Sequence, residues 1–292
     1  MEQARKSSLS EDVAVMNFRH YLRIKTVEPN PDYDGAVKFL TILGKTIGLE
    51  VCVIEVEPHM PVLIMTVPGA DSSLPSIMLY SHMDVVPAYP ERWTYDPFSG
   101  YKDEKGDIFG RGAQDMKVNG IQYVEAIRRL KQRGEAEFLR TVHIVFSPDE
   151  ECYCRGIKAL VKHEKFRKMN VGFSLDEGIA STDDIYRLYY AERNSWWVKV
   201  ECNGEPGHAS RYDMQDLASE KFIKIINALS NLGQQELKRL KADSGLSGGE
   251  ILSVNLTKVE GGTPGLALNV VPETFCAYFD VRVPPTVNPR VS

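Results

Sequence analysis

One histidine and several acidic residues stand at the ends of apolar runs, where they could act together on a substrate. His82 and Asp84 follow the apolar run 77–79, and acidic clusters follow two later runs, at 149–151 and 176–177. Short apolar runs are typical of buried strands, and open α/β sheets hold their ligands at the carboxyl ends of the strands. The pattern therefore indicates a shared site at one edge of a sheet.

A further carboxylate, that of Asp115, opens a predicted helix shortly after Gly110 and Gly112. Taken singly it is most simply an N-cap, and acidic clusters at strand ends are commonly just solvated. Three predicted strands that each end in histidine or acidic residues, with Asp115 as a fourth group, favour a shared cation site instead. One imidazole with several carboxylates suits zinc, or manganese or cobalt in its place. The number of acids allows two ions that activate a water, with one carboxylate left as a general base.

The elements that must position these residues alternate along the first part of the chain. Apolar residues at helical spacing predict helices near 12–22, 34–47, 115–133 and 157–163, and strand-like runs lie at 51–56, 61–67, 77–79, 141–146 and 171–175. This alternation predicts an α/β fold with a mainly parallel or mixed sheet flanked by helices. After residue 188 the order becomes strand, long helix, strand, strand, which is typical of a small α+β layer.

Composition excludes several classes of partner. The net charge of −5 gives no basic surface, so we expect no nucleic acid and no membrane partner. The polar start of the chain lacks the apolar core of a secretory signal, and no run approaches the roughly 20 apolar residues that span a bilayer. Five cysteines, an odd number, indicate reduced thiols in a cytoplasmic protein rather than a disulfide framework.

Six short motifs together resemble the co-catalytic zinc hydrolase family that includes aminoacylases, glutamate-releasing carboxypeptidases and dipeptidases. They are Ser-His-Met-Asp-Val-Val-Pro (81–87), Arg-Gly-Ala-Gln-Asp-Met-Lys (111–117), Pro-Asp-Glu-Glu (148–151), Leu-Asp-Glu-Gly (175–178), Pro-Gly-His-Ala-Ser (206–210) and Asn-Val-Val-Pro (269–272). The resemblance runs from about residue 12 to about residue 284. It implies a zinc-exopeptidase-like catalytic domain over 1–188, followed by an inserted α+β lid and dimerisation domain over 189–292.

The resemblance also implies two zinc ions in each subunit and a role for each acidic residue. His82 and Glu177 would bind one ion, Glu151 would bind the other, and Asp115 would bridge the two. Glu150 would be the general base and acid. The residues alone allow either Asp176 or its neighbour at the fourth ligand position, because the two follow the same strand.

Four more residues receive roles by the same resemblance. Asp84 would be the catalytic-site partner that orients His82. His208 would reach into the partner subunit's site and stabilise the oxyanion, which implies a homodimer formed through the lid. Arg282 would pair with the substrate carboxylate, and Asn269 is a weaker candidate for the same task. Without the resemblance, His208 is most simply an exposed turn residue, and Asn269 could equally be one.

The chain departs from the family pattern in two places. The residues 152–156, Cys-Tyr-Cys-Arg-Gly, stand where the family has a glycine-rich turn. The chain ends at Ser292, and none of its six histidines matches the family's last zinc ligand. We therefore expect a form truncated at the C-terminus, with both domains incomplete.

The expected function is hydrolysis of the amide bond of N-acyl-L-amino acids to a carboxylate and a free amino acid, by a zinc-dependent aminoacylase. The alternative is a truncated, non-catalytic aminoacylase-like protein that binds zinc weakly and pairs with a full-length homologue. Zinc content and hydrolysis distinguish the two hypotheses.

Overall fold

The computed structural model describes residues 11–262 and 268–288. The chain divides into two compact units, Met1–Tyr186 and Arg187–Ser292, and each is described by itself. In the first unit the helices are α1 (Val13–Arg23), α2 (Tyr33–Thr46), η1 (Pro90–Arg92), α3 (Lys117–Arg133), α4 (Arg155–Leu160) and α5 (Glu164–Met169). Its strands are β1 (Glu50–Glu57), β2 (Met60–Val67), β3 (Ser76–His82), β4 (Tyr101–Lys102), β5 (Ile108–Phe109), β6 (Val142–Ser147) and β7 (Val171–Leu175).

The main sheet of the first unit is mixed, with strand order β1-β2-β6-β3-β7. β1 and β2 form an antiparallel hairpin, and β2 pairs antiparallel with β6. β3 lies between β6 and β7 and is parallel to both. The structure confirms the predicted α/β class in its mixed form, with a parallel half that carries the candidate residues.

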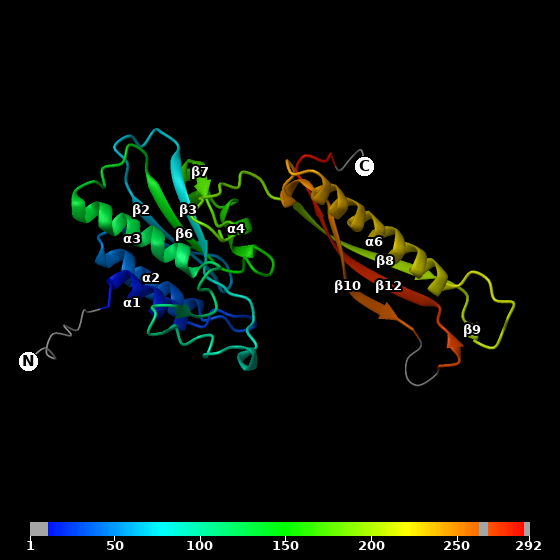
Figure 1. Cartoon of the computed structure of the whole chain (residues 1–292). Coiled ribbons are helices and arrows are strands. Elements are labelled where there is room, and N and C mark those ends of the chain that lie inside the picture. The colour runs from blue at the N-terminus through cyan, green and yellow to red at the C-terminus, as the bar shows by residue number, and fades with distance from the viewer. Residues whose placement is uncertain (1–10, 263–267, 289–292) are drawn as a thin grey trace, which may run out of the picture. The chain divides into compact units, whose positions relative to one another are not determined.

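Helices cover both faces of this sheet because its central strands are apolar on both sides. All six residues of β6 are buried, as expected for a strand inside a two-sided core. α2 and α3 pack on one face, and α4 and α5 contribute Leu160 and Met169 to the apolar cluster on the other (Figure 1). The helix predicted over 157–163 is wrong in its extent: α4 already ends at Leu160, and a second short helix, α5, starts at Glu164 with His163 as its N-cap.

The second unit is an antiparallel sheet covered by one long helix. Its elements are β8 (Asn194–Asn203), β9 (Gly207–His208), α6 (Ala218–Ala242), η2 (Gly248–Glu250), β10 (Ser253–Gly261), β11 (Val270–Val271) and β12 (Thr274–Val283). β12 is the central strand between β10 and β8, and α6 runs along this sheet (Figure 1). The short strands β9 and β11 pair with each other, which joins two segments distant in sequence.

Two features of the fold bear on earlier expectations of environment. Across the described ranges, none of the helices combines the length and apolarity that crossing a bilayer requires. The five cysteines are all free thiols: Cys52, Cys152, Cys154, Cys202 and Cys276.

The contact between α3 and the sheet leaves no room at Gly120. A Cβ atom there would lie 2.5 Å from Phe146 Cε1 and 2.9 Å from Ser81 Oγ. Alanine in an open helix position gains up to about 1 kcal/mol over glycine, whereas forcing an extra carbon into a packed core costs about 1–3 kcal/mol. We predict that Gly120→Ala lowers the free energy of unfolding by about 1–3 kcal/mol in urea titrations.

The matched control is Gln122→Ala, which changes an exposed residue of the same helix. It should alter the unfolding free energy by less than about 0.5 kcal/mol. A Gly120→Ala protein as stable as the parent would contradict the packing described for this helix.

Candidate metal centre

The parallel strands β3, β6 and β7 end at the same edge of the sheet. His82 is the last residue of β3 and pairs in register with Ser147, the last residue of β6. Residues 148–151 continue from β6, and residues 176–177 follow β7. The edge therefore collects the imidazole and the acidic clusters in one place, as the carboxyl ends of parallel strands generally do.

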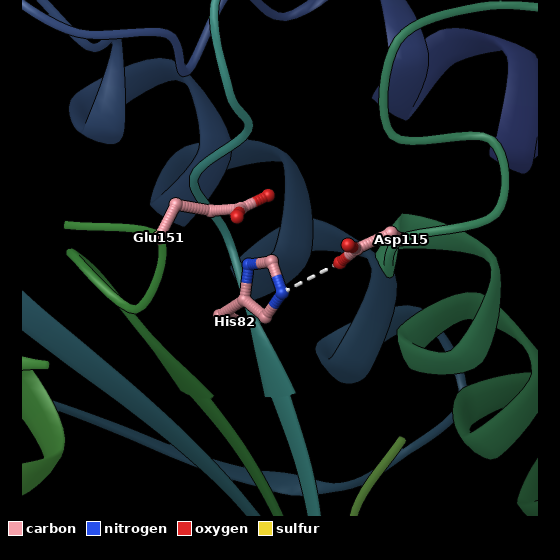
Figure 2. A group of neighbouring side chains, drawn as sticks. All are labelled: His82, Asp115 and Glu151. Atoms are coloured by element: carbon pink, nitrogen blue, oxygen red, sulfur yellow. Dashed lines mark hydrogen bonds and ion pairs between the residues drawn. The ribbon is translucent and has the colours of Figure 1, made fainter. Parts of the chain in front are cut away.

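Four carboxylates surround the His82 ring. Its Nε2 atom lies 3.0 Å from Asp115 Oδ1, 3.6 Å from Glu177 Oε1 and 3.8 Å from Glu150 Oε2. Glu151 lies beside the same ring, opposite Asp115 (Figure 2). The sequence-predicted ligands thus all reach one small volume.

Among the described residues, two overlapping sets could hold a metal ion. One consists of His82, Asp115 and Glu151, and the other of His82, Glu150 and Glu177; in each set the ligand atoms lie within 4.8 Å of one another. His82 belongs to both sets. An imidazole nitrogen with carboxylate oxygens is a donor set that zinc and related divalent ions accept.

The electrostatics of the site favour a bound cation. Burial and the surrounding carboxylates raise the pKa of Glu150, and burial followed by the charge of Asp115 raises the pKa of Glu151 to about 7. Burial alone would lower the pKa of His82, but its hydrogen bond to Asp115 and the nearby carboxylates of Asp84 and Glu177 raise it well above the usual value. The ligand set therefore fits a positively charged group, because each nearby carboxylate is stabilised by one.

The site is buried on the side of His82 and open to solvent on the side of the carboxylates. The His82 side chain is fully buried, whereas those of Asp115, Glu150 and Glu177 are 51%, 35% and 30% exposed. A substrate can therefore approach the carboxylates from solvent, while the ring that both sets share is fixed in the core.

Asp115 does not cap the helix that follows it. α3 begins at Lys117 after Met116, which makes no side-chain cap hydrogen bond, so the N-cap interpretation of Asp115 is wrong. Its carboxylate turns to His82 instead. The fully buried Lys117 ammonium donates hydrogen bonds to the carbonyl oxygens of Tyr21 (3.1 Å) and Ile24 (2.7 Å) at the end of α1. This tie holds the start of α3, and nothing in the sequence pattern pointed to it.

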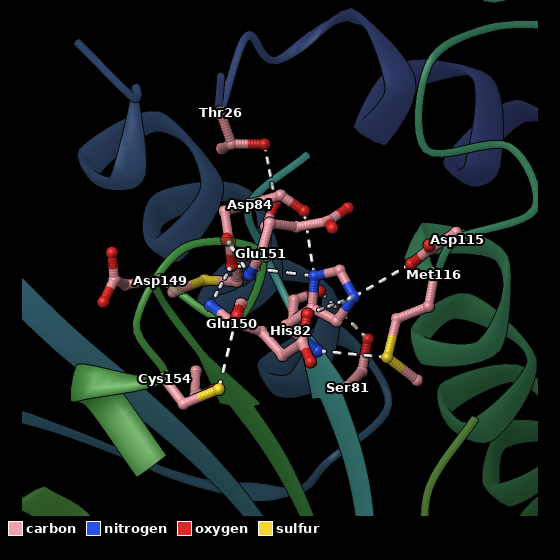
Figure 3. A network of polar contacts seen from close by, with 12 residues as sticks. Thr26, Ser81, His82, Asp84, Asp115, Met116, Asp149, Glu150, Glu151 and Cys154 are labelled. Carbon is pink, nitrogen blue, oxygen red and sulfur yellow. Dashed lines mark hydrogen bonds and ion pairs between the residues drawn. The ribbon is translucent and has the colours of Figure 1, made fainter. Parts of the chain in front are cut away.

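Asp84 contacts the histidine differently from the simplest expectation. His82 Nδ1 lies 2.9 Å from the backbone carbonyl oxygen of Asp84 and 3.6 Å from its carboxylate Oδ1. The carboxylate accepts hydrogen bonds from the backbone amides of Glu150 (3.0 Å) and Glu151 (2.9 Å; Figure 3). Asp84 thus fixes the ring through its carbonyl and the acidic loop through its side chain.

The other three predicted site residues lie in the second unit. His208 on β9 and Asn269 beside β11 meet, with Asn269 Nδ2 3.2 Å from His208 Nε2. Arg282 lies elsewhere, near the end of β12, where its guanidinium makes two hydrogen bonds to Asp280 (2.7 and 3.0 Å). Because strands rise about 3.3 Å per residue, Arg282 is roughly 26 Å along β12 from Thr274, the end nearest β11.

Comparisons with known proteins agree with this fold. The profile of peptidase family M20/M25/M40 matches residues 78–264. Aminoacylase-1 of Mus musculus is 48% identical over 284 residues, covering 97% of this chain and 68% of the mouse protein. Aminoacylase-1 of Homo sapiens is 46% identical with the same coverage. These matches confirm the resemblance drawn from the six motifs.

Solved structures share the fold. A tripeptidase from Staphylococcus aureus superposes with a TM-score of 0.67 at 19% identity, covering 95% of this chain and 66% of that one. At this identity the similarity concerns the fold alone, and the sequence matches carry the relationship. The chain belongs to peptidase family M20/M25/M40, together with its aminoacylase-1 relatives, and is a metal-dependent amide hydrolase.

Proposed function

We propose that this chain hydrolyses the amide bond of N-acyl-L-amino acids, releasing a carboxylate and a free amino acid. The observation that carries the proposal is the convergence of four carboxylates on His82 at the open edge of the sheet. The identity of 46–48% to proteins named aminoacylase-1 supports the choice of substrate class.

Two zinc ions are the proposed cofactor. His82 and Glu177 are assigned to one ion, Glu151 to the other, and Asp115 to the position between them. The distances of 3.0 Å and 3.6 Å from His82 Nε2 to Asp115 and Glu177 support the first group, and Glu151 lies in the same cluster of possible ligands. When bound, such ions polarise an amide carbonyl and lower the pKa of a water molecule.

Glu150 is the proposed general base and acid. Its carboxylate faces the centre, 3.8 Å from His82 Nε2, and its raised pKa suits a group that takes up a proton and releases it again. It would accept the proton of the attacking water and deliver it to the nitrogen of the leaving amino acid. Asp84 would keep the Glu150 backbone in place through the amide hydrogen bond described above.

The second unit is proposed to act as a lid in a homodimer. His208 and Asn269 meet at one end of the unit and Arg282 lies at the other end of β12. This separation supports an arrangement in which the two ends serve different active sites. His208 would donate a hydrogen bond to the oxyanion in the partner subunit's site, and Arg282 would exchange Asp280 for the substrate carboxylate.

We also propose that the enzyme works in the cytoplasm, where its five free cysteines would remain reduced. The non-catalytic alternative predicts no more than one zinc per chain and no hydrolysis. Measuring zinc content together with turnover therefore decides between the two functions.

The first prediction for this function concerns the general base. Glu150→Gln should lower hydrolysis of N-acetylmethionine by about 100- to 10,000-fold, because the amide cannot accept the water's proton. Zinc affinity, measured by competition with a chromophoric chelator, should stay within about threefold if Glu150 is a base and not a ligand. Glu164→Gln, at a 69% exposed position, is the control. A large loss of zinc affinity would instead make Glu150 a ligand.

The second prediction concerns the metal. Purified protein should retain two zinc ions per chain and lose hydrolysis on dialysis against a chelator, with recovery when zinc is restored. His82→Gln should lower the zinc content, because the ion assigned to His82 and Glu177 loses its imidazole ligand. His20→Ala, at an exposed histidine of α1, should retain both ions. Full zinc content in a folded His82→Gln protein would contradict the assignment.

The third prediction concerns the homodimer. His208→Ala should lower kcat about 100- to 1,000-fold with zinc content unchanged, as expected for loss of an oxyanion donor. Mixing this variant with Glu150→Gln under conditions of subunit exchange should restore up to about one quarter of the parent activity, because half of the dimers then contain one intact site. No recovery on mixing would mean that His208 serves its own chain or neither.

A further inference from the structure

The turn over residues 149–154 contains the acidic pair Glu150 and Glu151 and is held by side-chain contacts. The family resemblance led us to expect glycines just after this pair. Asp149 and Cys154 both have positive φ angles, +66° and +54°, a conformation that residues other than glycine seldom adopt. The turn closes through a hydrogen bond of 2.6 Å from the Cys154 amide to the Asp149 carbonyl. Without the freedom of glycine, other contacts must hold this backbone in place.

Asp149 and Arg155 supply those contacts. The Asp149 side chain is fully buried and accepts three hydrogen bonds from Arg155, from the backbone amide (3.0 Å), Nε (2.9 Å) and Nη2 (3.1 Å). The paired side-chain bonds form the bidentate fork that arginine makes with a carboxylate. On its other side, the Asp149 amide donates to the Tyr33 hydroxyl (3.1 Å).

This ion pair stands directly beside the metal centre. Glu150 and Glu151 follow Asp149 in the chain, and their amides donate to Asp84. The Cys154 thiol donates to the Glu150 carbonyl at 3.3 Å, which closes the loop from the far side (Figure 3). The backbone of the acidic pair is therefore fixed by Asp84 on one side and by the Asp149 turn on the other.

We propose that Arg155 is a positioning residue for the metal centre. Through its ion pair with buried Asp149, Arg155 fixes the backbone of Glu150 and Glu151. The family resemblance had led us to expect a glycine-rich turn in this role. Only the predicted effect of Arg155 on hydrolysis rests on the proposed function. Its structural consequence, the order of the acidic loop, is a property of the metal-free chain and can be measured separately.

The test compares R155M, R155K and D149N with the parent 292-residue chain. R155M removes the ion pair, R155K keeps the charge without the fork, and D149N keeps a residue that tolerates the positive φ angle. R129M is the matched control, since Arg129 is 52% exposed against 47% for Arg155 and pairs with Glu125 away from the site.

In the metal-free protein, R155M should speed amide hydrogen exchange in residues 148–156 and leave β3 unchanged. Zinc affinity should fall about 10- to 100-fold, as is usual when the residues that hold metal ligands are changed. The visible spectrum of the cobalt-substituted protein should change as well. kcat for N-acetylmethionine should fall more than KM rises. R155K should lie between R155M and the parent, and R129M should match the parent.

Parent-like exchange, zinc affinity and cobalt spectrum in folded R155M would overturn the proposal. If R155M does not fold, R155K and D149N decide, because both must then show faster loop exchange and weaker zinc binding. Zinc binding by the parent without any hydrolysis would contradict the proposed function and leave the positioning role to be judged on exchange and affinity. Normal hydrolysis in every variant would contradict the positioning role and leave the function intact.

Discussion

Repulsion among carboxylates gathered around one buried imidazole is the constraint on which the rest of this structure depends. Asp115, Glu150, Glu151 and Glu177 lie close enough that burial and mutual charge raise the pKa values of Glu150 and Glu151. Such a group ionises fully only when positive charge compensates it, because partly desolvated like charges disfavour ionisation together. The fold must therefore hold these side chains against their own repulsion until a cation binds.

The fold meets this demand by fixing backbone rather than the carboxylate oxygens themselves. Asp84 accepts the amides of the acidic pair, and its carbonyl orients the His82 ring. Lys117 ties the start of α3 to the end of α1, which fixes the approach of Asp115. Because these contacts lie beneath or behind the centre, the ligand oxygens remain directed toward one another and toward solvent. The buried polar groups of this region are thus part of the site.

The second unit keeps its two groups of candidate residues far apart. Its central strand β12 separates the His208 and Asn269 pair from Arg282 by most of its length. β12 is paired along its length with β8 and β10, and α6 packs along the same sheet. This separation suits a unit whose ends act at different places, which is the arrangement we propose for the homodimer.

The sequence by itself determined the long strands, the long helices and the identity of the clustered residues, because hydrophobic periodicity and strand ends are local properties. It could not determine that the Asp84 carboxylate would accept hydrogen bonds from the backbone amides of Glu150 and Glu151, 66 and 67 residues away. Nor could it determine that Asp115 would not cap the helix that follows it. It gave no sign that Lys117 would bond to the carbonyl oxygens of Tyr21 and Ile24 and so hold the start of α3. Those contacts depend on strand register and on which surfaces pack together. Only the tertiary structure decides these, because the partners are distant in the chain and meet only after it has folded.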